Sequence, residues 1–340
     1  MKLVTFEVKT DIGPFMRLGT LSGDRIIDLN LAYSTYLYNE EQDTIAYKVA
    51  EVRVPPDMKE FLIGGKASQD AAKKALQYID RFLKQKTEVV GPKGEKITHT
   101  VGKTRLLAPI PRPNSVRDFL CFEQHVAKSM GSVPPAFYST PIWYRASSDS
   151  IFGPEEVVPW PNYCDTDKLD YELEFAIVIG KQGKNIPIDK ADEYIAGYTI
   201  YNDVSCRDFT VDTWILGPTK CKIWDKSIGM GPCITTPDEI GDSHNLKMTA
   251  RVNGQVWSEG NSNTMYWTFP ELIAYLSREE TLYPGDLIGS GTVGNGCCLE
   301  LGKWIKPGDI VELEVQNIGI LRNKIGEKPE LIPLSRRTHP

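Results

Sequence analysis

The stretch Leu169-Asp-Tyr-Glu-Leu-Glu-Phe-Ala-Ile-Val-Ile-Gly180 places two carboxylates in a segment that otherwise reads as a buried β-strand. Residues 171–179 alternate and are rich in Val, Ile, Tyr and Phe, which predicts a strand that runs into the core. Residues i and i+2 of a strand point to the same face. We therefore expect Glu172 and Glu174 to project side by side, about 6–7 Å apart.

Two like charges on one strand face repel each other, and a shared divalent cation relieves that repulsion. Hard oxygen ligands suit Mg²⁺, Mn²⁺ or Ca²⁺. The alternative is a solvated strand face, on which paired glutamates need no ligand. The apolar run at 175–179 favours burial, but the pair alone leaves both interpretations open.

The overall composition is that of a soluble globular protein. The chain has 340 residues, of which 41% are hydrophobic and 25% charged, so it is long enough for one large domain and a smaller one. A net charge of −6 gives no reason to expect nucleic acid or an acidic membrane as a partner. No apolar run approaches the roughly 18–20 residues of a membrane span. The seven cysteines include no Cys-x-x-Cys pair, so neither a disulfide framework nor a zinc site is predicted, and we expect a cytoplasmic protein.

The pattern along the chain predicts two domains. Residues 1–30 alternate in short runs and predict a small β meander, and helical spacing follows at 34–52 and 56–86. Three prolines between residues 106 and 113 predict a stiff linker. We therefore expect a small N-terminal domain over 1–105 and a larger domain over 106–340. Short strands dominate the larger domain, with one helix expected at 268–278.

Three further motifs carry polar residues of chemical interest: Arg117-Asp-Phe-Leu-Cys-Phe-Glu-Gln-His125, Gly197-Tyr-Thr-Ile-Tyr-Asn-Asp-Val-Ser-Cys-Arg-Asp208, and Gly289-Ser-Gly-Thr-Val-Gly-Asn-Gly-Cys-Cys-Leu-Glu300. Each is weak by itself. A lone histidine such as His125 is more often structural, and Asn202-Asp203 fits turn chemistry. The glycine-rich segment lacks the lysine of a phosphate-binding loop.

Together, in this order and spacing, the motifs resemble the fumarylacetoacetate hydrolase family over about residues 105–325. The resemblance implies a β-rich α+β fold, with a mixed β-sandwich roll as the C-terminal domain and a small α/β N-terminal domain, packed as a homodimer. It also implies a divalent metal, Mg²⁺ first and Mn²⁺ or Ca²⁺ as alternatives. The implied substrate is a small β-dicarbonyl or 2-oxo acid.

The resemblance also implies a role for particular residues of this chain. The implied metal ligands are Glu172, Glu174, Asp203 and Asp118. The implied catalytic residues are His125 as base, Glu300 as its orienting partner, and Lys222, with Lys226 as the alternative lysine. The implied substrate contacts are Tyr144, Arg145 and Thr292.

The chain departs from the family pattern at several positions. Leu120 and Thr210 stand where the family has a tyrosine and a glutamine, so fumarylacetoacetate itself is not the expected substrate. Lys128 stands where decarboxylating and dehydrating members often have a glutamate three residues after the histidine. The predicted function is therefore metal-dependent hydrolysis of a C–C bond in an acylpyruvate or other β-dicarbonyl compound. A 2-oxo acid decarboxylase or sugar-acid dehydratase is the alternative, and a metal-binding protein without turnover is the third interpretation.

Overall fold

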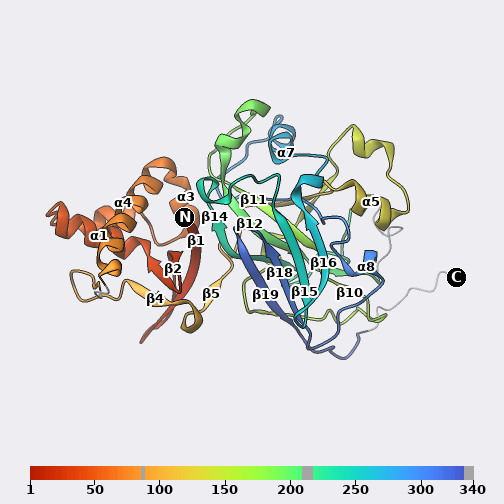
Figure 1. Ribbon diagram of the computed structural model, residues 1–340, viewed down its shortest axis with the longest axis horizontal. Helices are drawn as coiled ribbons and strands as arrows, with labels where there is room; N and C mark the ends of the chain where they lie inside the picture. Colours follow the sequence, from red (N-terminus) through yellow and green to blue (C-terminus); the bar gives the residue numbers. More distant parts are fainter. Residues whose placement is uncertain (86–88, 209–216, 333–340) are drawn as a thin grey trace.

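The computed structural model describes residues 1–85, 89–208 and 217–332. A small part that contains the N-terminus and several helices adjoins a larger, β-rich part (Figure 1). Strands of both parts belong to one sheet, in the order β4-β3-β2-β1-β14-β12-β11-β17-β6-β7. The antiparallel pairing of β1 with β14 joins the two parts within this sheet.

The N-terminal part is an antiparallel meander covered by helices. Its elements are β1 (Lys2–Thr10), β2 (Gly13–Ser22), β3 (Arg25–Asp28), α1 (Leu29–Glu40), α2 (Ala46–Arg53), α3 (Met58–Ile63), α4 (Gly65–Lys84) and β4 (Thr98–Thr100). Gly23, at φ 59°, lies in the turn between β2 and β3. The Asp28 side chain accepts a hydrogen bond from the Leu31 amide and caps α1, which therefore begins five residues before the predicted helical segment. The predicted meander is confirmed.

The larger part continues the same sheet and adds a second one. The first sheet contains β5 (Leu106–Leu107), β6 (Val116–Phe119), β7 (Trp143–Ala146), β8 (Ile151–Phe152), β11 (Leu173–Ile179), β12 (Ile195–Asp203), β14 (Ile228–Thr235) and β17 (Leu287–Gly289). The second sheet contains β9 (Val157–Val158), β15 (Lys247–Val252), β16 (Gln255–Asn261), β18 (Ile310–Val315) and β19 (Gly319–Ile325). A short pair is formed by β10 (Leu169–Asp170) and β13 (Ser205–Cys206). The domain boundary at 105/106 remains a proposal.

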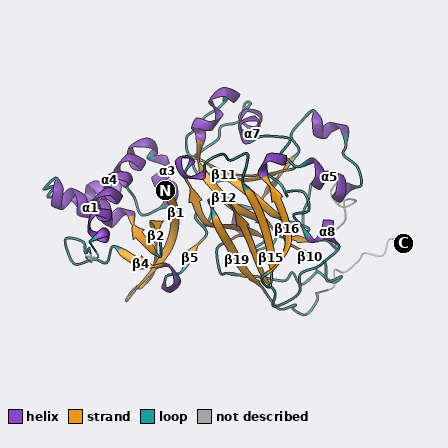
Figure 2. Cartoon of the chain, viewed as in Figure 1, coloured by secondary structure: helices purple, strands orange, loops and turns teal. Residues whose placement is uncertain are grey.

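The larger part also contains four α-helices among the described residues. They are α5 (Glu123–Met130), α6 (Pro237–Ile240), α7 (Phe269–Leu276) and α8 (Cys298–Leu301). Figure 2 labels α5, α7 and α8 around the strands. The predicted helix at 268–278 is α7, which has Pro270 in its first turn and a capping box between Thr268 and Glu271. The helix α5 was not predicted, because the residue before it, Phe122, makes no side-chain cap.

Strand β11 separates two buried layers, and its alternation decides where the site lies. Phe175 and Ile177 pack in the core between the two sheets, together with residues of β15 and β18. Ala176 belongs to the core on the opposite face, which also contains residues of α3. Glu174 lies two residues before Ala176 and therefore points to that opposite face, away from the sandwich core.

The sandwich core predicts a stability difference between two strand positions. Ile177 is fully buried, whereas Val256 on β16 is 53% exposed. We expect Ile177→Ala to lower the free energy of unfolding by about 2–5 kcal/mol, because it removes buried methyl groups and leaves a cavity. The control Val256→Ala should change it by less than about 0.5 kcal/mol. Denaturant unfolding of both variants measures the difference, and equal effects would contradict this packing.

Candidate active site

A group of buried carboxylates lies on the face of the sheet opposite the sandwich core. It comprises Asp118 of β6, Glu174 of β11 and Asp203 at the end of β12, and all three residues are at most 4% exposed. Their carboxylate oxygens lie within 4.8 Å of one another. The strand order β12-β11-β17-β6 brings together side chains that are far apart in the sequence.

Strand β17 lies between β11 and β6 and leaves space for this group. In the sheet register, Gly289 of β17 pairs with Ala176 on one side and with Asp118 on the other. A Cβ atom at Gly289 would lie 2.3 Å from Asp118 Oδ1, which is far inside contact distance. The glycine at this position is therefore a requirement for the observed orientation of the Asp118 carboxylate.

Each carboxylate of the group accepts a hydrogen bond from the surrounding chain. The Tyr144 hydroxyl donates to Asp203 Oδ2 at 2.7 Å, and the Thr292 hydroxyl donates to Glu174 Oε1 at 3.1 Å. The Gly291 amide lies 3.3 Å from Asp118 Oδ1 and donates to it. Glu174 Oε2 and Asp203 Oδ1 are buried and have no hydrogen-bond partner among the described residues. Buried, unpaired carboxylate oxygens are costly unless a cation takes their lone pairs.

Burial and mutual repulsion also raise the pKa values of these carboxyl groups. Burial, followed by the negative charge of Asp203, raises the pKa of Asp118 well above its ordinary value. Burial and then the charge of Asp118 do the same to the pKa of Glu174. Burial also raises the pKa of Asp203. The protein alone therefore favours protons on this group, and a divalent cation would compete with those protons.

Glu172 lines the same cavity, but its carboxylate is held by two cationic side chains. It forms ion pairs with Lys222 and Arg207. Burial by itself would raise the pKa of Glu172, but Lys222 and then Arg207 lower it below its ordinary value. Arg207 also pairs with Asp170 at 2.8 Å. Glu172 is thus ionised, and it lies at the edge of the group formed by Asp118, Glu174 and Asp203.

The structure distinguishes between the two predicted lysines. The Lys222 ammonium is buried, contacts Glu172, and lies 2.8 Å from Asp203 Oδ2. Lys226 is 48% exposed and pairs with Glu156 at 2.8 Å. Burial would lower the pKa of Lys222, but Asp203 and then Glu172 raise it above its ordinary value. Lys222 is therefore a permanent positive charge within the site.

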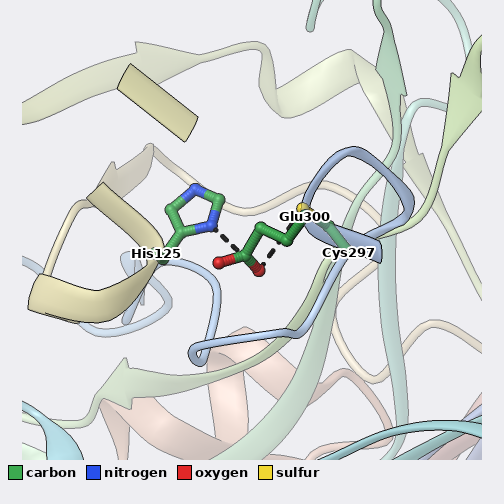
Figure 3. Close-up of side chains that lie close together, drawn as sticks. All are labelled: His125, Cys297 and Glu300. Carbon is green, nitrogen blue, oxygen red and sulfur yellow. Dashed lines mark hydrogen bonds and ion pairs between the residues drawn. The ribbon is translucent and has the colours of Figure 1, made fainter. Parts of the chain in front are cut away.

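His125 and Glu300 meet at the packing of α5 against α8. His125 Nδ1 lies 3.4 Å from Glu300 Oε2, and their side chains are only 6% and 0% exposed. Figure 3 shows the second ring nitrogen on the side of the imidazole that faces away from Glu300. Catalytic hydrogen bonds are often long before substrate binds. Nδ1 has no hydrogen-bond partner among the described residues at this distance, and a closer approach of Glu300 would hold a proton on Nδ1 and leave Nε2 as the basic atom.

One cavity of about 400 Å³ is lined by most of these groups. Asp203 and Glu300 are not among its lining residues, but they contact Lys222 and His125, which are. Its polar lining consists of Asp118, His125, Ser129, Tyr144, Glu172, Glu174, Arg207, Lys222 and Thr292. Its apolar lining includes Phe119, Leu120, Ile142, Trp143 and Leu299. The volume is suited to a small organic acid. A larger hollow of about 970 Å³ lies beside α4, and none of the site residues named above lines it among the described residues.

The prediction that Arg145 contacts the substrate is not supported by this geometry. Successive residues of a strand point to opposite faces, so Arg145 of β7 points away from the face that Tyr144 shares with the carboxylates. The Arg145 side chain is 62% exposed and lies 3.3 Å from Glu280. Thr210 lies outside the described residues.

Sequence reasoning did not identify the roles of Gly289, Trp143 and Cys297. Gly289 was noted only as part of a glycine-rich loop, and its role depends on which strands flank β17. Trp143 precedes the expected contact Tyr144 and lines the cavity. Cys297 forms an isolated bridge with Glu172, which no sequence spacing indicates.

The residues present fit a divalent cation. They supply several carboxylate oxygens, two of them without a hydrogen-bond partner among the described residues. The cationic groups Lys222 and Arg207 do not balance the negative charge, because Arg207 is also shared with Asp170. A set of hard oxygen donors in a negative, buried site selects a hard cation.

Within the described residues, no helix is long and apolar enough to cross a membrane. Residues 114–326 match the family profile described as fumarylacetoacetate (FAA) hydrolase C-terminal. Human oxaloacetate tautomerase FAHD2A, mitochondrial, is 32% identical over 334 residues, which cover 96% of this chain and 91% of that protein. Oxaloacetate tautomerase YisK from Bacillus subtilis is 33% identical over 242 residues, which cover 67% of this chain and 75% of that protein.

A likeness of fold extends to solved structures. The crystal structure of maleylpyruvate hydrolase from Sphingobium sp. SYK-6, in complex with manganese (II) ion and pyruvate, aligns with a TM-score of 0.66 at 21% identity. The alignment covers 97% of this chain and 100% of that chain.

Gly289 provides a test of the carboxylate group that leaves the ligands themselves unchanged. In Gly289→Ala the new methyl group would overlap Asp118 Oδ1. The Asp118 carboxylate is the end of a flexible side chain, so it would move away and relieve the overlap. We expect Mn²⁺ affinity to fall by about 10–100-fold, the range for residues that orient a metal ligand. The control is Gly102→Ala, whose Cβ would have no atom within 4 Å among the described residues. Titration with Mn²⁺ measures both, and unchanged affinity in Gly289→Ala would contradict the assignment of Asp118.

Proposed function

The chain belongs to the fumarylacetoacetate hydrolase family, and we propose that it is a metal-dependent enzyme that interconverts the keto and enol forms of a short 2-oxo acid. The observation that carries this proposal is that Asp118, Glu174, Lys222 and His125 line one cavity, and that Lys222 contacts the third carboxylate, Asp203. Oxaloacetate is the first substrate to test, because the human and B. subtilis relatives are named as oxaloacetate tautomerases. Family membership and the fold of this family agree with the resemblance seen in the sequence.

Asp118, Glu174 and Asp203 would hold the cation, with Glu172 at the rim of the site. We keep Mg²⁺ as the expected ion and Mn²⁺ or Ca²⁺ as alternatives, and the manganese in the Sphingobium enzyme supports this class of ion. When bound, the cation supplies positive charge that attracts the oxygens of a 2-oxo carboxylate and stabilises negative charge on the 2-oxo oxygen.

The side chains of the cavity divide the proton transfer between them. His125 would take a proton from the carbon next to the 2-oxo group, because its Nε2 is the basic atom of the His125–Glu300 pair. Lys222 is not a candidate for this role, since its raised pKa keeps it protonated. Its ammonium would instead hold the developing negative oxygen. His125 would then deliver this proton to the 2-oxo oxygen, which forms the enol O–H bond in place of the C–H bond and leaves the number of protons on the substrate unchanged.

The apolar lining would exclude water from this exchange. Leu120, Ile142 and Trp143 line the cavity beside the polar groups. Their side chains lower the local dielectric constant and strengthen each electrostatic contact within the cavity. They would also keep a reactive enol from losing or gaining protons to bulk solvent.

Hydrolysis of a C–C bond in an acylpyruvate is the second candidate. The His125–Glu300 pair favours it, because the same imidazole could take a proton from water rather than from carbon. Lys128, which contacts Asn295, stands where decarboxylating members often have glutamate, so the lyase alternative has less support. Assembly as a homodimer and a cytoplasmic location remain predictions.

Parallel assays distinguish these functions. In the first, keto–enol equilibration of oxaloacetate is followed by enol absorbance with Mg²⁺ or Mn²⁺, against a blank that contains the metal alone. In the second, acetylpyruvate is incubated with the protein, and acetate and pyruvate are quantified. We expect faster equilibration of oxaloacetate without loss of CO₂. Cleavage of acetylpyruvate with no effect on oxaloacetate would favour the hydrolase, and inactivity in both assays would favour a binding protein.

Replacement of His125 tests the role of the base. We expect His125→Ala to lower kcat by about 10²–10⁴-fold, because the proton transfer loses its base. Its Mn²⁺ content should match that of the wild type, since carboxylates hold the cation. His244→Ala is the matched control, because His244 is only partly buried and lies in the loop before β15. Wild-type kcat in His125→Ala would contradict this role.

A further inference from the structure

A second group of metal-ligating atoms lies directly beside the carboxylate group. It consists of His125 of α5, together with Cys297 and Glu300 at the start of α8. One ligand atom from each residue lies within 4.8 Å of the others. Figure 3 shows the Glu300 carboxylate between the imidazole and the thiol. The sequence lacks a Cys-x-x-Cys pair and predicts no zinc site, but the packing of α5 against α8 assembles a nitrogen, a sulfur and an oxygen.

Two of the three distances within this group match edges of a zinc tetrahedron, and the third, from nitrogen to sulfur, is within 4.8 Å. Bond lengths of about 2.0–2.1 Å to nitrogen and oxygen and about 2.3 Å to sulfur place tetrahedral ligands about 3.4 Å apart for nitrogen and oxygen, and about 3.6 Å apart for sulfur and oxygen. His125 Nδ1 lies 3.4 Å from Glu300 Oε2. Cys297 Sγ lies 3.6 Å from the same oxygen.

The hydrogen-bonding state of the group is an independent indication of a ligand. His125 Nδ1 and Glu300 Oε1 are buried and have no hydrogen-bond partner within the part of the chain that the structure describes. The side chains of His125 and Glu300 are 6% and 0% exposed, and the imidazole nitrogen faces the carboxylate. Water therefore has little access to these atoms, and the cost of leaving them unpaired persists.

We propose that His125, Cys297 and Glu300 form a second, inhibitory site for Zn²⁺ or a similar borderline-soft divalent ion. A neutral imidazole, one thiolate and one carboxylate together cancel the two charges of the ion, which suits a buried position. The Cys297 thiol releases its proton to solvent when the ion binds. Of the three residues, His125 lines the cavity, so an ion bound to its imidazole would remove the base from that cavity.

The two sites select different ions. The carboxylate group offers oxygen donors only, which suit Mg²⁺ and Mn²⁺, whereas the thiolate and imidazole of the second group favour Zn²⁺. The backbone bridge between Glu172 and Cys297 fixes the second group next to the first. The inhibitory effect rests on the proposed function, because it requires His125 to be the base. Zinc binding at this site does not rest on it.

Binding is tested with Co²⁺, which occupies zinc sites in place of Zn²⁺. It gives a near-ultraviolet absorption band when a thiolate coordinates it. The wild-type protein, saturated with Mg²⁺, should give this band with one Co²⁺ per chain. Cys297→Ala should lose the band. Cys233→Ala is the matched control, because it removes another buried thiol that belongs to no group of metal-ligating atoms among the described residues. It should keep the band. A wild type without the band, or a Cys297→Ala variant that keeps it, overturns the proposed site.

Inhibition is tested on the same proteins at saturating Mg²⁺. Zn²⁺ should inhibit the wild type and Cys233→Ala, and the concentration for half inhibition should rise by about 10–100-fold in Cys297→Ala. Cys297→Ser, with nearly the same shape, repeats the test if the alanine variant folds poorly. A band without inhibition would refute the regulatory role while leaving the binding site intact. An inactive wild type with an intact band would instead refute the proposed function.

Discussion

The buried repulsion among Asp118, Glu174 and Asp203 constrains the rest of the site. Two unit charges 4 Å apart repel by about 4 kcal/mol at an effective dielectric constant of about 20. A domain of this size has a total stability of only about 5–15 kcal/mol. The protein must therefore protonate the group or supply a cation. The hydrogen bonds from Tyr144 and Thr292 satisfy one oxygen each of Asp203 and Glu174, and they leave the opposite oxygens to a ligand.

The surrounding fold holds these carboxylates together against their mutual repulsion. The sandwich core on one face of β11 holds the strand in register, while the opposite face carries the carboxylates. Gly289 leaves room for Asp118, and Lys222 places a fixed positive charge against Glu172 and Asp203. The same face of the sheet thus combines the acidic groups with a buried lysine whose positive charge the neighbouring carboxylates Asp203 and Glu172 stabilise.

The elements with a strong local pattern were predictable from the sequence. The alternation of residues 171–179 predicted β11 and the shared face of Glu172 and Glu174, and the helix expected at 268–278 corresponds to α7. Contacts that depend on the arrangement of strands were not predictable. The ion pairs of Glu172 and the exposed position of Arg145 follow from strand neighbours and faces that spacing alone does not define. The choice of Lys222 over Lys226 likewise required the fold.

The position of the bound ion tests the central claim most directly. Crystals grown with Mn²⁺ and measured near its absorption edge would give an anomalous difference map. The account predicts a peak between Glu174 Oε2 and Asp203 Oδ1, within bonding distance of Asp118, at about 2.0–2.3 Å from each ligand oxygen. A map with no peak among these three carboxylates, or with the ion held only at the molecular surface, would contradict it.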